Sequence, residues 1–226
     1  MGDYQDNSLS GRVFQKLRDD ILQGNYKEHD ELRENTIGKE LGVSRTPVRE
    51  ALRQLELEGL VTIVPNKGAY VTGISVKDVK DIYMIRSSLE GLCARWAAEN
   101  ITPEQLDKLE EIILISEFHM KKEGGGGAET ISQLDGKFHA VLYEASNSRI
   151  LSRVLLDFHK YVQQARKSSV VSEERARKSI REHKAILRAI KEKDPDTAEQ
   201  LANEHIQHVI ENLKKQGFDK ILQGDR

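Results

Sequence analysis

Residues 42–53 read Gly-Val-Ser-Arg-Thr-Pro-Val-Arg-Glu-Ala-Leu-Arg, and this stretch decides how the N-terminal part of the chain is organised. Gly42 is a natural residue to follow the end of a helix because glycine tolerates positive φ. Ser44 is suited to the N-cap of the next helix, and a proline is tolerated in the first turn. Apolar residues then recur at helical spacing, at Val48, Leu52 and Leu55. The stretch therefore predicts a helix, a tight turn and a second helix.

Further elements are predicted on both sides of this stretch. Val13, Leu17 and Ile21 indicate an earlier helix, and Leu32, Ile37 and Leu41 indicate a short helix before the turn. Residues 60–73 contain two β-rich runs around Pro-Asn-Lys-Gly at 65–68, which is typical of a hairpin. Three helices followed by a hairpin, in this order, predict a winged helix-turn-helix.

From about residue 76 the pattern is purely helical. We expect six helices joined by short connections, which favours an antiparallel helical bundle. One of the breaks between them is a run of four glycines at 124–127. The expected helices span residues 76–100, 103–122, 130–146, 148–168, 173–193 and 195–216. The prediction is a mainly α chain, with a winged helix-turn-helix over 1–75 and an antiparallel helical bundle over 76–226.

Composition limits the possible classes of protein. The 226 residues contain a single cysteine, Cys93, which excludes an intrachain disulfide and a cysteine-based zinc cluster. No apolar run approaches the roughly 18 residues needed to span a bilayer, and residues 1–10 are polar. We therefore expect a cytoplasmic protein with no membrane partner.

Net charge argues against indiscriminate binding to nucleic acid. The chain has 35 Lys and Arg against 37 Asp and Glu, a net charge of −2. Residues 1–75 hold 10 basic and 12 acidic residues, so the predicted winged domain is not basic either. Any DNA binding must depend on where individual basic side chains are placed, with marked sensitivity to salt.

The first turns of the predicted third helix carry side chains suited to DNA. The guanidinium of Arg45 can contact guanine O6 and N7 with two hydrogen bonds. Ser44 and Thr46 suit phosphates or a thymine methyl group, and Arg49, one turn further on, suits a phosphate. The hairpin tip could reach the flanking backbone or minor groove through Asn66, Lys67 and Gly68. The alternative is an ordinary solvated helix face.

Three histidines fall on the apolar stripes of three separate predicted helices. Asp135 and His139 are four residues apart and share one helix face, while His183 and His205 lie between apolar residues of their own helices. A single such histidine is most often an ordinary core residue. Three of them, with an aspartate that would be costly to bury alone, make a metal site an equal alternative.

Several motifs resemble a known family. Residues 42–52, Glu-Gly-Leu-Val at 58–61 and Asn-Lys-Gly-Ala-Tyr-Val at 66–71 closely resemble the N-terminal domain of GntR-family bacterial transcription regulators. Asp-Ile-Tyr at 81–83, Ile-Arg-Ser-Ser-Leu-Glu at 85–90 and the later Ala-Ala at 97–98 are similar to the FCD effector domain of the FadR subfamily. Together the two similarities cover nearly the whole chain.

The resemblance implies a homodimeric transcription regulator and not an enzyme. Such a protein binds a double-stranded, usually palindromic operator, and a small metabolite controls its operator affinity. Asn35 stands where family members commonly have an arginine that contacts the operator, so Arg33 and Asn35 are expected to give a different operator preference.

The resemblance also implies a ligand set for a divalent metal. Asp135, His139, His183 and His205 stand where many FCD domains bind a metal, and imidazole ligands favour zinc or nickel among the candidates. A small organic acid would bind beside the metal, and Arg86 is the candidate guanidinium for its carboxylate. The alternative for Arg86 is an ion pair with Glu90, one turn further on.

Two other functions are compatible with the same residues. In one, the metal ion itself is the signal that changes operator affinity. In the other, the site is a metal-dependent hydrolase, although no acidic residue near the ligand segments stands out as a general base.

Overall fold

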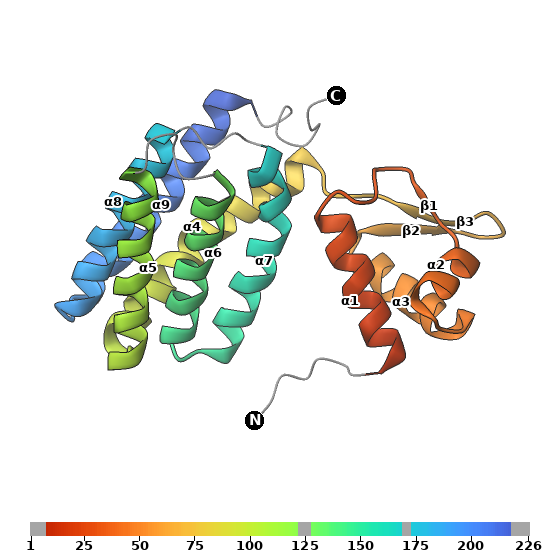
Figure 1. The fold of residues 1–226 in the computed structure, drawn as a ribbon, viewed down its shortest axis with the longest axis horizontal. Helices are drawn as coiled ribbons and strands as arrows, with labels where there is room; N and C mark the ends of the chain where they lie inside the picture. The colour runs from red at the N-terminus through yellow and green to blue at the C-terminus, as the bar shows by residue number, and fades with distance from the viewer. Residues whose placement is uncertain (1–7, 122–127, 169–172, 218–226) are drawn as a thin grey trace. The chain divides into compact units, whose positions relative to one another are not determined.

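The chain divides into two compact units, Met1–Ser75 and Val76–Arg226, in a computed structural model that describes residues 8–121, 128–168 and 173–217. Both units are shown in Figure 1. The first is a small helical domain with a three-stranded sheet, and the second is made of helices throughout its described residues. The fold class is therefore the predicted one, mainly α with a small β-wing.

The N-terminal unit has the element order of a winged helix-turn-helix. Strand β3 lies in the middle of the sheet and pairs antiparallel with both β1 and β2. Val61 lies opposite Val71 and Val64 opposite Gly68, so β2 and β3 form the predicted hairpin. The elements are α1 (Leu9–Leu22), β1 (Glu31–Leu32), α2 (Glu34–Leu41), α3 (Arg45–Leu57), β2 (Val61–Val64) and β3 (Gly68–Val71).

The structure corrects the prediction for Leu32. Sequence periodicity assigned it to the second helix, but it lies in β1, opposite Ala69 of β3, and its side chain is buried. Two residues are too short to show the alternation that marks a strand. The helix begins only at Glu34, after Arg33 in extended conformation.

The turn between α2 and α3 follows the predicted chemistry in part. Gly42 has φ 66°, the left-handed conformation that glycine accepts at a helix C-cap. Ser44 is the N-cap residue of α3, but its side chain makes no capping hydrogen bond. The buried face of α3 packs against α1 and consists of Pro47, Val48, Ala51, Leu52 and Leu55.

The C-terminal unit is a helical bundle, and its helices lie side by side in Figure 1. Helix α4 packs against α6, α7, α8 and α9. Gly91 allows the close approach of α9, since a Cβ at this position would collide with the side chain of Asn203. The bounds are α4 (Val76–Asn100), α5 (Pro103–Lys121), α6 (Ala128–Ala145), α7 (Arg149–Ser168), α8 (Glu173–Lys191) and α9 (Pro195–Gln216).

All six bundle helices match their predicted ranges to within two residues at each end. The predicted break at the four glycines, 124–127, lies outside the described residues. None of the described helices is long and apolar enough to cross a membrane.

Candidate functional sites

The predicted DNA-contacting residues of the N-terminal unit are exposed. They lie at three places: the start of α2, the start of α3 and the turn between β2 and β3. A concavity of about 450 Å³ is lined by residues from all three places. Five of the predicted residues line it, namely Arg33, Asn35, Arg45, Arg49 and Gly68. Ser44, Thr46, Asn66 and Lys67 are exposed outside this lining.

The turn of the wing has a specific local conformation. Asn66 has φ 62° and Gly68 has φ 117°. Positive φ is uncommon for residues other than glycine, and asparagine is among the residues that adopt it most readily. The backbone N–H of Lys67 donates to the carbonyl of Val64, at 3.0 Å, which closes the turn. The Tyr70 hydroxyl donates to the Lys67 carbonyl, also at 3.0 Å. These bonds fix the backbone of Lys67, whose side chain is exposed at the tip.

Acidic residues pair with the predicted arginines, which the sequence analysis did not anticipate. Arg33 Nε donates to Glu31 at 2.9 Å. Arg45 and Arg49 both donate to the carboxylate of Glu34, the first residue of α2. Each of these pairs is at the surface, where water can compete with it.

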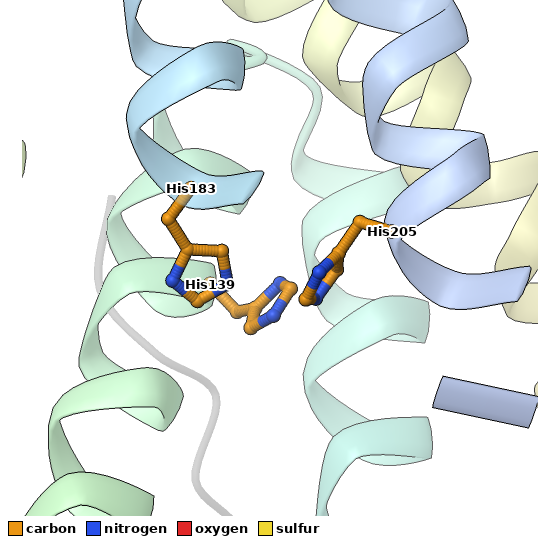
Figure 2. Close-up of side chains that lie close together, drawn as sticks. All are labelled: His139, His183 and His205. Atoms are coloured by element: carbon orange, nitrogen blue, oxygen red, sulfur yellow. The ribbon is translucent and has the colours of Figure 1, made fainter. Parts of the chain in front are cut away.

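Three buried histidines converge inside the bundle. His139 comes from α6, His183 from α8 and His205 from α9, and Figure 2 shows their rings pointing toward one another. Each residue offers one ligand atom within 4.8 Å of those of the others. Their ring centroids are 4.8–5.3 Å apart. The arrangement brings together all three histidines of the predicted ligand set.

Asp135 lies beside this cluster. One of its oxygens is 3.9 Å from His139 Nε2 and the other is 3.9 Å from His183 Nε2. Two ligands that each bind one ion at about 2.1 Å can be at most about 4.2 Å apart. The carboxylate is therefore placed where it could share an ion with both rings. Ser179 on α8 donates to Asp135 at 3.3 Å and helps to orient it.

Two carboxylates orient the histidines, a role that the sequence did not predict for either of them. Glu90 on α4 lies 3.1 Å from His139 Nδ1, and Glu182 on α8 lies 2.7 Å from His205 Nδ1. An ionised carboxylate can only accept, so both Nδ1 atoms carry the hydrogen and donate it. In the neutral rings, Nε2 is then the atom with a free lone pair, which is the form that binds a metal.

The surroundings keep both carboxylates ionised. Burial alone would raise the pKa of Glu90, but its interactions with His139 and Arg86 outweigh this effect and hold the pKa well below its ordinary value. Burial likewise opposes ionisation of Glu182, and hydrogen bonds from His205 and Arg175 still lower its pKa. The hydroxyl of Tyr143 also donates to Glu90.

His183 has a different environment. Its ring stacks on Phe138, with centroids 4.0 Å apart and planes at 9°. Its Nε2 atom is buried and has no hydrogen-bond partner among the described residues. Burial, followed by the proximity of His205, lowers the pKa of His183 well below its ordinary value, so the ring is neutral at pH 7. A buried nitrogen without a partner costs about 1–3 kcal/mol, which a metal ion at this position would relieve.

These observations fit a metal better than an ordinary core. Three imidazole nitrogens, a nearby carboxylate and two oriented Nδ1 donors are the features of a nitrogen- and oxygen-rich divalent metal site. The histidine ligand atoms lie within 4.8 Å of one another, compared with at most about 4.2 Å for two ligands of one ion. Ring movements of a fraction of an ångström would bring them within range.

Arg86 forms an ion pair with Glu90, which was the alternative predicted for it. Its side chain is 2% exposed, and its Nε and Nη2 atoms donate to Glu90 at 3.2 and 2.6 Å. Through Glu90, Arg86 is connected to His139. Direct contact between Arg86 and an effector stays a prediction.

Two more histidines lie close to the cluster. The ring centroid of His159, on α7, is 6.0 Å from that of His139. Its Nε2 lies 3.2 Å from where a Cβ on Gly136 would be, so glycine makes room for this ring on α6. His208 on α9 is half exposed and its Nδ1 lies 2.9 Å from Glu182. His159 is spaced from Leu151, Leu155 and Val162 so that it falls on the buried stripe of α7. This spacing could have identified His159 from the sequence as an inward-facing histidine.

Comparisons with known proteins agree with both halves of the structure. Residues 9–71 match the family model described as "Bacterial regulatory proteins, gntR family", and residues 81–208 match the FCD domain. The chain is 31% identical to the uncharacterised HTH-type transcriptional regulator YdhC of Bacillus subtilis, over 90% of each chain. It is 27% identical to the HTH-type transcriptional repressor RspR of Escherichia coli, over 92% of this chain and 90% of the repressor.

A solved structure shows the same architecture. The Escherichia coli McbR/YncC structure superimposes with a TM-score of 0.72 at 26% sequence identity. The match covers 92% of this chain and 98% of that chain.

Proposed function

Because the chain belongs to the GntR family of bacterial transcription regulators and carries an FCD domain, we propose that it is a sequence-specific DNA-binding regulator whose operator affinity depends on a small carboxylate bound at a metal site. The observation that carries the proposal is the convergence of His139, His183 and His205 beside Asp135. The family consists of regulators and the relatives are named as such, so a hydrolase is not favoured.

The DNA-binding part of the proposal assigns roles to exposed side chains. Arg45 reads a base edge in the major groove, and Arg49 contacts phosphate from the next turn of α3. Ser44 and Thr46 support them at the start of the helix. Arg33 and Asn35 contact DNA from the start of α2, and the wing tip contacts the flanking backbone or minor groove through Asn66, Lys67 and Gly68.

The metal part of the proposal assigns four ligands. Asp135, His139, His183 and His205 hold a divalent transition metal, with zinc and nickel as the leading candidates because of the three imidazoles. When bound, the metal supplies positive charge and open coordination positions for a carboxylate. Glu90 and Glu182 hold the rings of His139 and His205 in the tautomer that presents Nε2.

The effector is proposed to be a small organic acid. A carboxylate is attracted to positive charge in a site shielded from water, where electrostatic interactions are strong. Arg86 would respond to such a ligand through Glu90 and His139, because its own donors are engaged by Glu90. The connection links the ligand site to α4, the first helix after the wing.

We also propose a homodimer, because of the way such regulators bind DNA. Two winged domains read two half-sites of a palindromic operator at a fixed separation. Bundle helices carry exposed apolar side chains that a second copy could cover, including Met84 and Ile85 on α4 and Ile150 on α7. We also propose a cytoplasmic location, because the DNA of a bacterium lies there.

A thermal-shift screen of the metal-loaded protein against organic and sugar acids tests the effector proposal. A ligand that prefers the folded state raises the melting temperature. We expect a rise with some acids for the zinc- or nickel-loaded protein and none for the chelated protein. No rise with any acid, combined with a change in operator affinity on chelation alone, would favour a regulator that senses the metal itself.

A further inference from the structure

One carboxylate holds both arginines at the start of α3. Arg49 donates from Nε to one oxygen of Glu34 and from Nη2 to the other, both at 2.9 Å. Arg45 donates from Nε to Glu34 at 3.0 Å, and its Nη2 lies at the same distance. The Glu34 side chain is 25% exposed, so the cluster is open to solvent.

The arrangement at Glu34 imitates the way arginine binds DNA. A guanidinium fork takes a carboxylate and a phosphate with the same two-pronged geometry. The Nε and Nη2 donors of Arg45 and Arg49 that would contact a phosphate or a guanine edge are therefore already engaged within the protein.

The charges at this cluster are fixed over the physiological range of pH. Hydrogen bonds from Arg49, and then from Arg45, lower the pKa of Glu34 despite a desolvation effect in the opposite sense. The hydrogen bond to Glu34 raises the pKa of Arg49. Two arginines and one glutamate thus present a net charge of +1 to DNA instead of +2.

We propose that Glu34 is a specificity-determining residue, which suppresses binding to random DNA by competing with phosphates for Arg45 and Arg49. A random duplex offers mainly phosphates, so replacing the Glu34 carboxylate with a phosphate as the partner of the arginines adds little binding free energy. An operator also offers base-edge contacts to Arg45, and the free energy of these contacts offsets the loss of the ion pairs with Glu34. The inference rests on the proposed function, since it assumes that this surface binds DNA.

The placement of Glu34 agrees with the composition of the domain. Residues 1–75 have a net charge of −2, so general electrostatic attraction to DNA is weak. Arg33 is likewise paired, with Glu31. Pairing the arginines with acidic residues further lowers the affinity for DNA of any sequence. Discrimination between sequences then depends on the base contacts that only an operator supplies.

The test compares E34Q with E40Q, which makes the same charge change at an exposed site on the same helix. Binding to a random-sequence 30-bp duplex, and to a duplex recovered from a random library by the wild type, is measured by fluorescence anisotropy between 50 and 200 mM salt. One additional phosphate contact steepens the salt slope by about 0.9. Relative to 1 M salt, this corresponds to about fifteenfold tighter binding at 50 mM and about fourfold at 200 mM.

We expect E34Q to show this gain in affinity on the random duplex and a smaller gain on the selected duplex. The ratio of the two affinities, selected over random, should therefore fall. E34D keeps the charge and should retain the wild-type salt slope. The inference is overturned if E34Q matches E40Q on the random duplex, or if E34Q weakens both duplexes equally, as a merely structural residue would. A wild type that recovers no duplex from the library and does not bind the random duplex would instead refute the proposed function.

Discussion

His139 Nδ1 donates to the buried carboxylate of Glu90 at 3.1 Å, which connects the histidine cluster to α4. The same carboxylate accepts from Arg86, one turn earlier on α4. Because Arg86 and Glu90 are 2% and 1% exposed, this is an ion pair inside the bundle and not at its surface. The orientation of a proposed metal ligand therefore depends on a charge pair that belongs to another helix.

Removing Arg86 alone should destabilise the bundle strongly. The variant R86M leaves the Glu90 charge buried without its arginine, which costs about 3–5 kcal/mol. The double variant R86M/E90Q removes both charges and should recover part of that loss. Urea unfolding of the wild type, R86M, E90Q and the double variant gives the free energies of unfolding. If the loss in the double variant equals the sum of the losses in R86M and E90Q, the two charges do not stabilise one another.

Neutralising Glu182 should weaken metal binding without removing a ligand. The variant E182Q loses the charge that holds His205 Nδ1, and loss of such an outer partner typically lowers metal affinity by about 10–100-fold. E174Q is the matched control on α8, because Glu174 is exposed and pairs with Lys178. Competition with a chromophoric chelator gives the affinities, and equal values for the two variants would exclude this role for Glu182.

Removing His183 should remove the metal. The variant H183A deletes one of three converging imidazoles, so the protein should retain far less zinc or nickel after dialysis. H29A is the control, because His29 is exposed on the other unit. Elemental analysis decides the point, and unchanged metal content would remove His183 from the ligand set.

The two arginines at the start of α3 should differ in what they contribute to DNA binding. R45A should cost about 1–3 kcal/mol on the selected duplex and relax preference at one base position. R49A should weaken all duplexes alike and reduce the salt slope by about one. Equal losses on selected and random DNA for both variants would contradict these separate roles.

Most of the fold could be predicted because its signals are local. Helix periodicity, together with breaks at prolines, glycines and Asn or Ser pairs, placed all six bundle helices, and the turn before Ser44 placed α3. Strand β1 could not be predicted because its two residues, Glu31 and Leu32, are stabilised only by pairing with β3. That pairing depends on residues nearly forty positions away.

The site shows the same division between local and long-range information. Apolar stripes on single helices identified His139, His183 and His205 as inward-facing. Glu90 and Glu182 were missed because their contacts with histidines depend on how α4, α8 and α9 rotate against their neighbours. Glu34 was missed for the same reason, since its partners lie 11 and 15 residues further along the chain.

The most direct test of the account is operator affinity measured against metal and acid together. The wild type is titrated onto the duplex that it selects from a random library, in chelated form, zinc- or nickel-loaded form, and loaded form with each acid that raises the melting temperature. We predict that such an acid changes affinity at least several-fold for the loaded protein, and has no effect on the chelated protein or on H183A. The same affinity in all three forms would contradict control of DNA binding by this site.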